Sequence, residues 1–149
     1  MIEAIIALSI TLIGFTGVIG ILTRSLALNK DISQKFIATY LAAEGIEVVK
    51  GLIDYNNANY LSWNRGITAG NYEVSHNSTA LVSDTGSFLK FTSSTGIYSY
   101  TAGTDTPFKR TITIESPHIG EISVVSLVSW SERGAYKQVD LEDHFFDWR

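Results

Sequence analysis

The sequence predicts an α+β protein in which one long amino-terminal helix, apolar in its first half, packs by its second half on an antiparallel β-sheet. Three observations predict this fold class. Residues 4–23 form an uncharged apolar run, residues 29–54 continue with helical apolar spacing, and residues 108–142 alternate apolar and polar residues between short turns. A helix and a sheet that each carry an apolar face bury those faces against each other.

The length of 149 residues fits one compact domain, or one domain with an appendage. We expect a membrane helix segment over residues 1–28 and a globular head over residues 29–149. Within the head, the expected parts are the second half of the helix (29–54), a loop with weak strands (55–107), an antiparallel meander (108–142) and a tail (143–149).

The composition excludes several classes of function. The chain has no cysteine, which removes a disulfide scaffold, a thiolate zinc site and a cysteine nucleophile. Its formal net charge of −4 argues against a nucleic-acid partner, because such proteins carry a basic patch. Charged residues are nearly absent from the first 23 positions, so the chain joins an apolar segment to an ordinary polar one.

The run from Ala4 to Thr23 is long enough to cross a membrane as a helix. Its 20 residues match a hydrocarbon core of about 30 Å. A secretory signal peptide is the alternative, but nothing basic precedes the run and no cleavage-like break follows it. We therefore expect a membrane helix.

The orientation of this span depends on what precedes Met1. Arg24, Lys30 and Lys35 follow the span, and by the positive-inside rule these residues alone place the globular part in the cytoplasm. If a basic leader ahead of Met1 is removed during processing, the globular part lies outside.

Glu3 stands at the head of the apolar run. A carboxylate drawn into lipid without a partner costs about 2–4 kcal/mol or more. One interpretation leaves Glu3 at the membrane interface, and the other lets it enter the apolar layer and meet a cation. The first basic residue is Arg24, about 30 Å further along a helix. The partner would then be an amino terminus, its own or that of another subunit, which makes Met1 the second candidate assembly residue.

Three glycines recur inside the span, at Gly14, Gly17 and Gly20. Each lowers helix stability by about 1 kcal/mol relative to alanine. Their spacing is not that of a nucleotide-binding loop, because no strand precedes them and no polar residues flank them. Close packing between membrane helices is the simplest interpretation, since small residues let helix backbones approach.

The second half of the helix carries an apolar stripe. The stripe is expected to include Ile37, Leu41, Val48 and Leu52, widened by Phe36, Tyr40, Val49 and Ile53. Lys35, Glu47, Lys50 and Asp54 lie mostly off it. A stripe of this kind buries itself against another element, here the sheet that follows.

The middle of the chain is polar. Residues 56–70 are expected to form a loop, and residues 70–103 to contain weak strands around Tyr72 and residues 88–91. Asp54 and Asn56 have the spacing of calcium-loop ligands, but Ala58 follows and no ligand glutamate stands at the required distance. Residues 77–79 fit the N-glycosylation pattern, which also occurs often by chance.

The strongest strand signals come last. The first strand carries on one face Phe108, Arg110, Ile112 and Ile114. The second carries on one face Ile122, Val124, Val128 and Trp130, and on the other Val125 and Leu127. The third runs from Tyr136 to Leu141. The second strand is apolar on both faces and is therefore expected to be central. Short turns between the three strands predict an antiparallel meander.

No pattern for catalysis is recognised. The histidines are His76, His118 and His144, and His144 lies among Glu142, Asp143 and Asp147. Such a cluster could hold a metal, but a solvated charged end is the preferred interpretation. No nucleophile elbow, zinc-protease motif or phosphate loop occurs. We expect no enzyme activity, no cofactor and no metal; a deep pocket that converged on the histidines would argue otherwise.

The residues from Met1 to Ile10 resemble the amino-terminal signature of type IV pilins and pseudopilins, and Glu3 matches the glutamate of that signature. The family pattern has two further residues, usually with an aromatic start, ahead of the position of Met1. The stretch from Tyr40 to Lys50 resembles the helix of pilin-like proteins from small-genome, uncultivated bacteria, and the ending from Phe146 to Arg149 is similar to theirs.

The resemblance implies how the protein is processed and assembled. A prepilin peptidase would cut a short basic leader after a glycine, and the new amino terminus would often be methylated. The chain would wait in the inner membrane and then enter a helical homopolymer through pilus assembly machinery. The resemblance also implies that the helix melts locally at Gly14, Gly17 and Gly20 when subunits pack into a filament.

We expect a structural subunit of a cell-surface or extracellular filament for adhesion, motility or DNA uptake, with Glu3 setting the register against a neighbouring amino terminus. A pseudopilin of a type II secretion or competence machine is the alternative within the family. A monomeric membrane-anchored domain, whose Tyr- and Ser-rich middle segment binds a surface ligand, is the alternative from another class.

Overall fold

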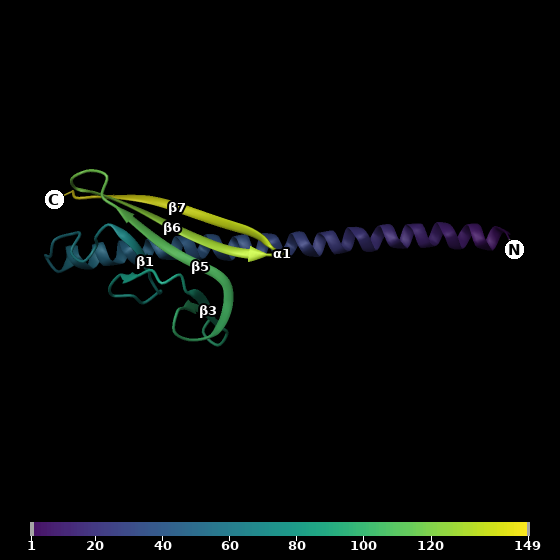
Figure 1. The fold of residues 1–149 in the computed structure, drawn as a ribbon, viewed down its shortest axis with the longest axis horizontal. Coiled ribbons are helices and arrows are strands. Elements are labelled where there is room, and N and C mark those ends of the chain that lie inside the picture. Colours follow the sequence, from purple (N-terminus) through teal and green to yellow (C-terminus); the bar gives the residue numbers. More distant parts are fainter. Residues whose placement is uncertain (1, 149) are drawn as a thin grey trace. The chain divides into compact units, whose positions relative to one another are not determined.

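The computed structural model describes residues 2–148, and the predicted α+β class is confirmed. The chain divides into two compact units, one up to Phe36 and one from Ile37 onward. A single helix, α1 (Ile2–Ala58), contributes to both units. The strands that follow are β1 (Gly70–Glu73), β2 (Val82–Ser83), β3 (Phe88–Thr92), β4 (Ile97–Ser99), β5 (Thr104–Glu115), β6 (Glu121–Glu132) and β7 (Ala135–Phe146) (Figure 1).

In the second unit, β5 is the hub of an antiparallel sheet. One edge of β5 pairs with β1 near Ile112 and with β3 near Lys109, and its other edge pairs with β6. β2 extends β1, β4 extends β3, and β7 pairs with β6. The expected meander is confirmed as β5, β6 and β7, which run side by side in Figure 1.

The strand β6 is central, as its apolar faces predict, because it lies between β5 and β7. The face that carries Val124 and Val128 is buried against α1, while Val125 and Leu127 on the other face are half-buried. On β5, one face is buried, and it carries the predicted residues Phe108, Arg110, Ile112 and Ile114.

Two strand boundaries differ from prediction. β5 begins at Thr104 rather than at residue 108, and β7 continues to Phe146, so most of the expected tail is strand. β7 pairs with β6 in unbroken register from Ala135 to Phe146. Within residues 2–148, the other edge of β7 pairs with no strand. The weak strands expected around Tyr72 and residues 88–91 are β1 and β3; β2 and β4 were not expected.

The helix also ends later than predicted, at Ala58 rather than at residue 54. Asn56 is buried, and its side-chain amide donates hydrogen bonds to the carbonyls of Trp63 at 3.1 Å and Arg65 at 2.9 Å. These bonds fold the next loop back onto the last helical turn. The polar residues of this turn, which look like loop in the sequence, are therefore held in helix.

The buried face of α1 is narrower and smaller than the predicted stripe. It comprises Ala38, Leu41, Ala42, Gly45, Val49, Ile53 and Asn56. Phe36 and Tyr40, which were expected to widen the stripe, are exposed instead, and Val48 and Leu52 are half-buried. Small residues bring the helix close to the sheet, so the long side chains to either side are left at the margins.

The core has two parts along α1. One gathers around Val49 and Ile53 with Ile112, Ile114 and Val124 of the sheet. The other gathers around Leu41 and Ala42 with Leu89, Phe108, Val128 and Trp130. The helix is thus clamped to the sheet at two points, and the residues between them decide how closely the two layers approach.

Candidate functional site

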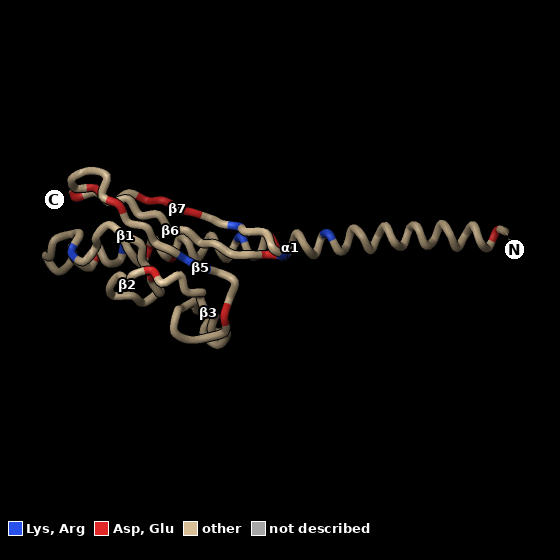
Figure 2. Tube along the Cα trace, in the orientation of Figure 1, with Lys and Arg blue, Asp and Glu red and all other residues tan. Residues whose placement is uncertain are grey.

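The amino-terminal part of α1 is the first candidate surface. Within residues 2–148, α1 is the one helix that is long and apolar enough to cross a membrane, and none of its most apolar stretch is buried. Residues 2–26 are exposed throughout, including large side chains such as Ile5, Leu8 and Phe15. Figure 2 shows this part of α1 as a long tan stretch between charged positions. Membrane embedding is compatible with these properties.

The hydroxyl groups of this stretch are satisfied inside the helix. Ser9 donates a hydrogen bond to the carbonyl of Ile5 and Thr11 to that of Ala7, both at 2.8 Å. Thr16 and Thr23 bond in the same way to carbonyls four residues earlier. Since these hydroxyls need no outside partner, they add little to the cost of placing the helix in an apolar medium.

Glu3 is therefore the polar residue of this stretch that matters most. It lies exposed in the first turn of α1, and it is the one charged residue between positions 2 and 23. A carboxylate in the first turn of a helix is stabilised by the helix dipole by about 0.3–1 kcal/mol at an exposed site. Met1, the other candidate assembly residue, lies outside the described residues, so the pairing stays a prediction.

The three glycines lie in unbroken α-helix. A Cβ atom built on Gly14, Gly17 or Gly20 would meet no atom within 4 Å. Nothing in the chain itself therefore requires glycine at these positions. Melting of the helix was expected of the assembled state, where it stays a prediction; a filament map with unbroken i to i−4 hydrogen bonds here would contradict it.

Arg110 is a buried cation that contacts α1 and the segment after β1. Its side chain, on β5, is fully buried. Its guanidinium donates hydrogen bonds to the carbonyl of Leu41 at 2.8 Å and to that of Val74, and it lies 3.4 Å from the carboxylate of Glu44. A buried cation is tolerated only when it is paired and hydrogen-bonded. Arg110 thus ties α1 and the segment after β1 to the sheet.

The surroundings of Arg110 leave little room. A Cβ atom on Gly45 would lie 2.5 Å from the hydroxyl oxygen of Ser126 and 2.6 Å from Cδ1 of Ile112. Tyr100 donates a hydrogen bond to the carbonyl of Arg110 at 3.1 Å. Burial raises the pKa of Tyr100 to about 12, so its hydroxyl remains a donor at physiological pH. Close packing at Gly45 fixes the spacing of helix and sheet.

Two histidines, His118 in the β5–β6 turn and His144 near the end of β7, both contact the carboxylate of Glu121. One carboxylate oxygen of Glu121 lies 2.7 Å from Nδ1 of His118, and the other lies 2.8 Å from Nδ1 of His144. Nε2 of His144 lies 3.1 Å from Glu142, which also accepts a hydrogen bond from Ser123. These contacts fasten the turn to the last part of β7.

The contacts shift the charges of the cluster. The hydrogen bond with Glu121 raises the pKa of His144 above its ordinary value. Hydrogen bonds from His144 and then His118 lower the pKa of Glu121. His144 is exposed and Glu121 is half-buried, so solvent screens part of their interaction. The expected neighbours Asp143 and Asp147 are not the contacts that cause these shifts.

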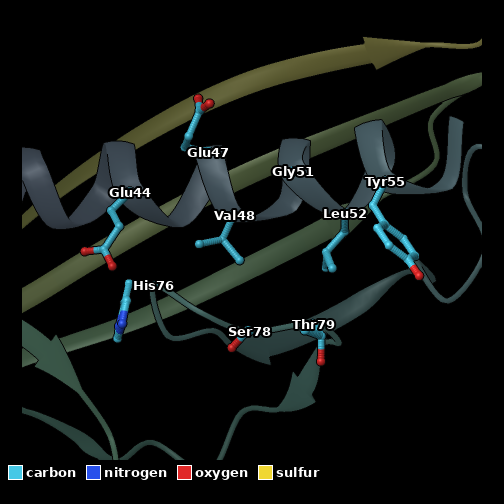
Figure 3. Close-up of a pocket in the computed structure, with 9 residues that line it drawn as sticks. All are labelled: Glu44, Glu47, Val48, Gly51, Leu52, Tyr55, His76, Ser78 and Thr79. Carbon is cyan, nitrogen blue, oxygen red and sulfur yellow. The ribbon is translucent and has the colours of Figure 1, made fainter. Parts of the chain in front are cut away.

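A hollow of about 540 Å³ opens between α1 and the segment after β1. Figure 3 shows Glu44, Val48 and Leu52 directed from the helix toward this segment, with the imidazole of His76 below the Glu44 carboxylate. Ser78 and Thr79 form the opposite wall, and Gly51 leaves the helix side open. Its lining therefore combines apolar helix side chains with two carboxylates, one imidazole and three hydroxyl groups.

Two further hollows adjoin the first. One of about 340 Å³ reaches from Glu44 back to Ile37 and Tyr98, and one of about 370 Å³ shares Leu52, Tyr55 and Thr79 with the first and continues to Asn56. We call these three hollows together the α1 furrow. It follows one side of α1 through most of the head.

The histidines do not converge on one pocket. His76 lines the α1 furrow, whereas His118 lines a separate shallow hollow. No group of three or more histidine and carboxylate side chains within residues 2–148 is arranged to hold a metal ion. Absence of enzyme activity and of cofactors stays a prediction.

Two weaker patterns now have positions. Asp54 is exposed and Asn56 is buried two positions later in the same helix, so their side chains do not share a face on which they could form one calcium ligand set. Asn77 is exposed, in a turn closed by a hydrogen bond from the backbone N–H of Ser75 to the Ser78 hydroxyl at 2.8 Å. Glycosylation there is not tested.

Sequence reasoning missed three features of the head: the Glu44–Arg110 pair, the Glu121 contact with two histidines, and the furrow. An arginine among the inward positions of a predicted strand was the signal for the first. For the second, the signal was the meander itself, because its register brings the start of β6 beside the end of β7. No signal in the sequence locates the furrow.

Comparisons with known proteins identify no relative of this chain, because no protein-family model, no curated protein and no solved structure matches it.

Proposed function

We propose that this chain is a structural subunit of a type IV pilus-like filament. It would be held in a membrane by the apolar part of α1 before assembly and would polymerise through the same residues afterwards. The observation that carries the proposal is the exposure of residues 2–23, with a single glutamate at the head of an otherwise uncharged run. Such a surface needs either lipid or other helices around it.

Glu3 gives the proposed polymer its register. In a bundle of apolar helices an unpaired carboxylate costs several kcal/mol. Symmetry offers one nearby cation, the amino terminus of an adjacent subunit. This pairing forms at one axial stagger only, so it selects a register as well as contributing energy.

The head is proposed to face outward from a cell-surface filament that serves adhesion, motility or DNA uptake. Support comes from the contrast between the two units: residues from Ile37 onward bury their own core, so they need no neighbour to fold. The expected partners are further copies of the chain, a prepilin peptidase and pilus assembly machinery, with no nucleic acid.

Electron microscopy of the native protein tests the proposal. Long uniform filaments support a pilin. Short filaments, or none in the presence of a secretion machine, favour a pseudopilin. Monodisperse, membrane-bound protein without any filament would replace the proposal with an anchored binding domain.

A substitution at Glu3 tests the mechanism. We expect Glu3→Gln to insert and fold normally but to give few or no filaments, because it loses the ionic pair. Ser9→Ala is the matched control, since the Ser9 hydroxyl is already satisfied by its own helix. Filaments are counted at equal membrane levels of each protein. Equal counts for Glu3→Gln and wild type would reduce Glu3 to an interfacial residue.

A further inference from the structure

Gly51 is a helix glycine that its own chain does not explain. Gly45, the other glycine in the head part of α1, is required by contact with Ser126 and Ile112. A Cβ atom on Gly51 would meet nothing within 4 Å. A glycine at such a position lowers helix stability by about 1 kcal/mol relative to alanine. Gly51 lines the α1 furrow, so the missing side chain leaves room for something outside the chain.

The furrow has the lining of a groove that accepts a helix. Val48 and Leu52 supply apolar contact from one side, and Thr79 lies on the opposite wall. Glu44 links two of its hollows. Helix-binding grooves generally take apolar side chains that recur at three- and four-residue spacing.

Charge indicates which helix fits. Residues 37–149 hold 13 acidic and eight basic residues, a net charge of −5, whereas residues 24–35 hold three basic residues and one acidic, a net charge of +2. At the furrow, the side chain of Glu44 is 30% exposed beyond its contact with Arg110. Glu47, at the rim, is 74% exposed, and one of its carboxylate oxygens lies 3.6 Å from the Lys50 ammonium on the same helix. The furrow is thus suited to an apolar helix that carries basic residues.

We propose that the α1 furrow receives residues 24–35 of a second copy of this chain. This segment carries Leu26, Leu28 and Ile32, all exposed, beside its basic residues. The inference rests on the self-assembly proposed above and adds a second subunit contact to it. The two surfaces differ, so each copy offers its segment to one neighbour and its furrow to another. A contact of this heterologous kind generates open-ended polymers or rings rather than closed dimers.

Site-specific disulfides test the contact directly, because the chain has no cysteine of its own. One tagged full-length copy carries Leu28→Cys, and a second, differently tagged copy carries Thr79→Cys on the furrow wall. Both are produced together in membranes and oxidised. We expect a mixed dimer at least tenfold above that formed between Leu28→Cys and Ser131→Cys, an exposed position on β6 outside the furrow.

Two substitutions ask whether the furrow itself makes the contact. Gly51→Leu fills open space and raises helix propensity, so it should not lower the melting temperature, whereas it should reduce the mixed dimer at least tenfold. Ala43→Leu, at an exposed position of the same helix that lines none of the three hollows, is the matched control and should retain it. Glu47→Lys should reduce the mixed dimer about fivefold, and Arg24→Glu in the partner copy should restore it.

The outcomes separate this proposal from the filament itself. Filaments in microscopy with no mixed dimer above the Ser131→Cys control would overturn the furrow contact and leave the filament proposal standing. A mixed dimer that Gly51→Leu removes, in protein that never forms filaments, would support the contact and overturn the filament. A mixed dimer unchanged by Gly51→Leu would also overturn the contact.

Discussion

Two stretches of α1 differ in whether their apolar side chains are buried within the chain. Residues 2–26 of α1 carry isoleucine, leucine and phenylalanine on all sides and bury none of them. Residues 37–58 bury one face, and that face consists partly of small residues such as Ala38, Ala42 and Gly45. The second stretch is stabilised by its own sheet, and the first can be stabilised only by surroundings outside the chain.

The difference between the two stretches determines how strongly packing constrains each residue. Apolar burial stabilises by about 25 cal/mol for each Å² removed from water. The head obtains this internally, and its fit to the sheet therefore constrains individual positions tightly. The first stretch buries none of its large apolar side chains within the chain, so stabilisation of this kind would have to come from lipid or from other helices.

Removing residues 1–23 is the largest break in this comparison. We expect the remaining chain to be soluble and monomeric, because nearly all of the uninterrupted apolar surface is removed while both core clusters remain. Residues 24–35 and the α1 furrow are retained, but their contact is expected to add to the packing of the apolar helices and not to hold copies together without it. Size-exclusion chromatography at high protein concentration measures this. Filaments or large oligomers of the truncated chain would show that the head carries assembly surfaces of sufficient strength by itself.

Replacing Arg110 tests whether the head is as self-sufficient as its core suggests. We expect Arg110→Ala to lower the free energy of unfolding by about 3–5 kcal/mol, since a buried pair and its hydrogen bonds are lost. Lys109→Ala, on the opposite face of β5, loses only a contact of its ammonium with the Phe88 ring and should cost about 0.5–1 kcal/mol. Urea denaturation of both variants gives the two values, and equal values would argue that Arg110 is not an anchor.

Alanine at the two head glycines sharpens the comparison within the second stretch. Gly45→Ala should destabilise, because overpacking against Ser126 and Ile112 costs about 1–3 kcal/mol. Gly51→Ala should stabilise by up to about 1 kcal/mol, since only helix propensity changes. Thermal unfolding of the two variants gives opposite shifts of the melting temperature. Shifts of the same sign would mean that the two positions do not differ in packing.

The histidine cluster offers the smallest effect and a defined pH window. The raised pKa of His144 means that its contribution to stability is full below pH 6.5 and is lost as the pH rises through the folded value. The lowered pKa of Glu121 means that its contribution is present above pH 4.5 and is lost as the pH falls through the folded value. The turn should be held most firmly between these two limits.

NMR titration of His144 checks this window. We expect a pKa above 6.5 in the wild-type protein and a lower value in Glu121→Gln, because the hydrogen bond with Glu121 is the main cause of the raised pKa. An unchanged titration in Glu121→Gln would assign the shift to Glu142 instead.

The sequence was sufficient to predict those elements whose residues repeat with the period of the structure. β5 and β6 alternate, and the helix keeps its spacing, so both were expected. The extension of β7 was missed because Asp140, Glu142 and His144 face solvent, and a charged outer face resembles a tail. The last helical turn was missed because its stability depends on the buried amide of Asn56, which no local pattern reveals.

The candidate sites divide in the same way. Glu3 and the three glycines were found in the sequence because a charge or a glycine within an apolar run stands out locally. The Glu44–Arg110 pair joins residues that are 66 positions apart, and the furrow depends on a glycine whose significance lies in empty space. Such features require the packed structure.

The open edge of β7 has a consequence for solubility. β7 has 12 residues, and within residues 2–148 one of its edges pairs with no strand. Such an edge is a template for edge-to-edge aggregation, which natural sheets resist with charged side chains. Asp140, Glu142 and Asp143 lie along this strand, and Figure 2 shows their part of β7 in red. Two such edges brought together would place like charges side by side. The acidic residues of β7 thus oppose edge-to-edge pairing between two copies of the sheet.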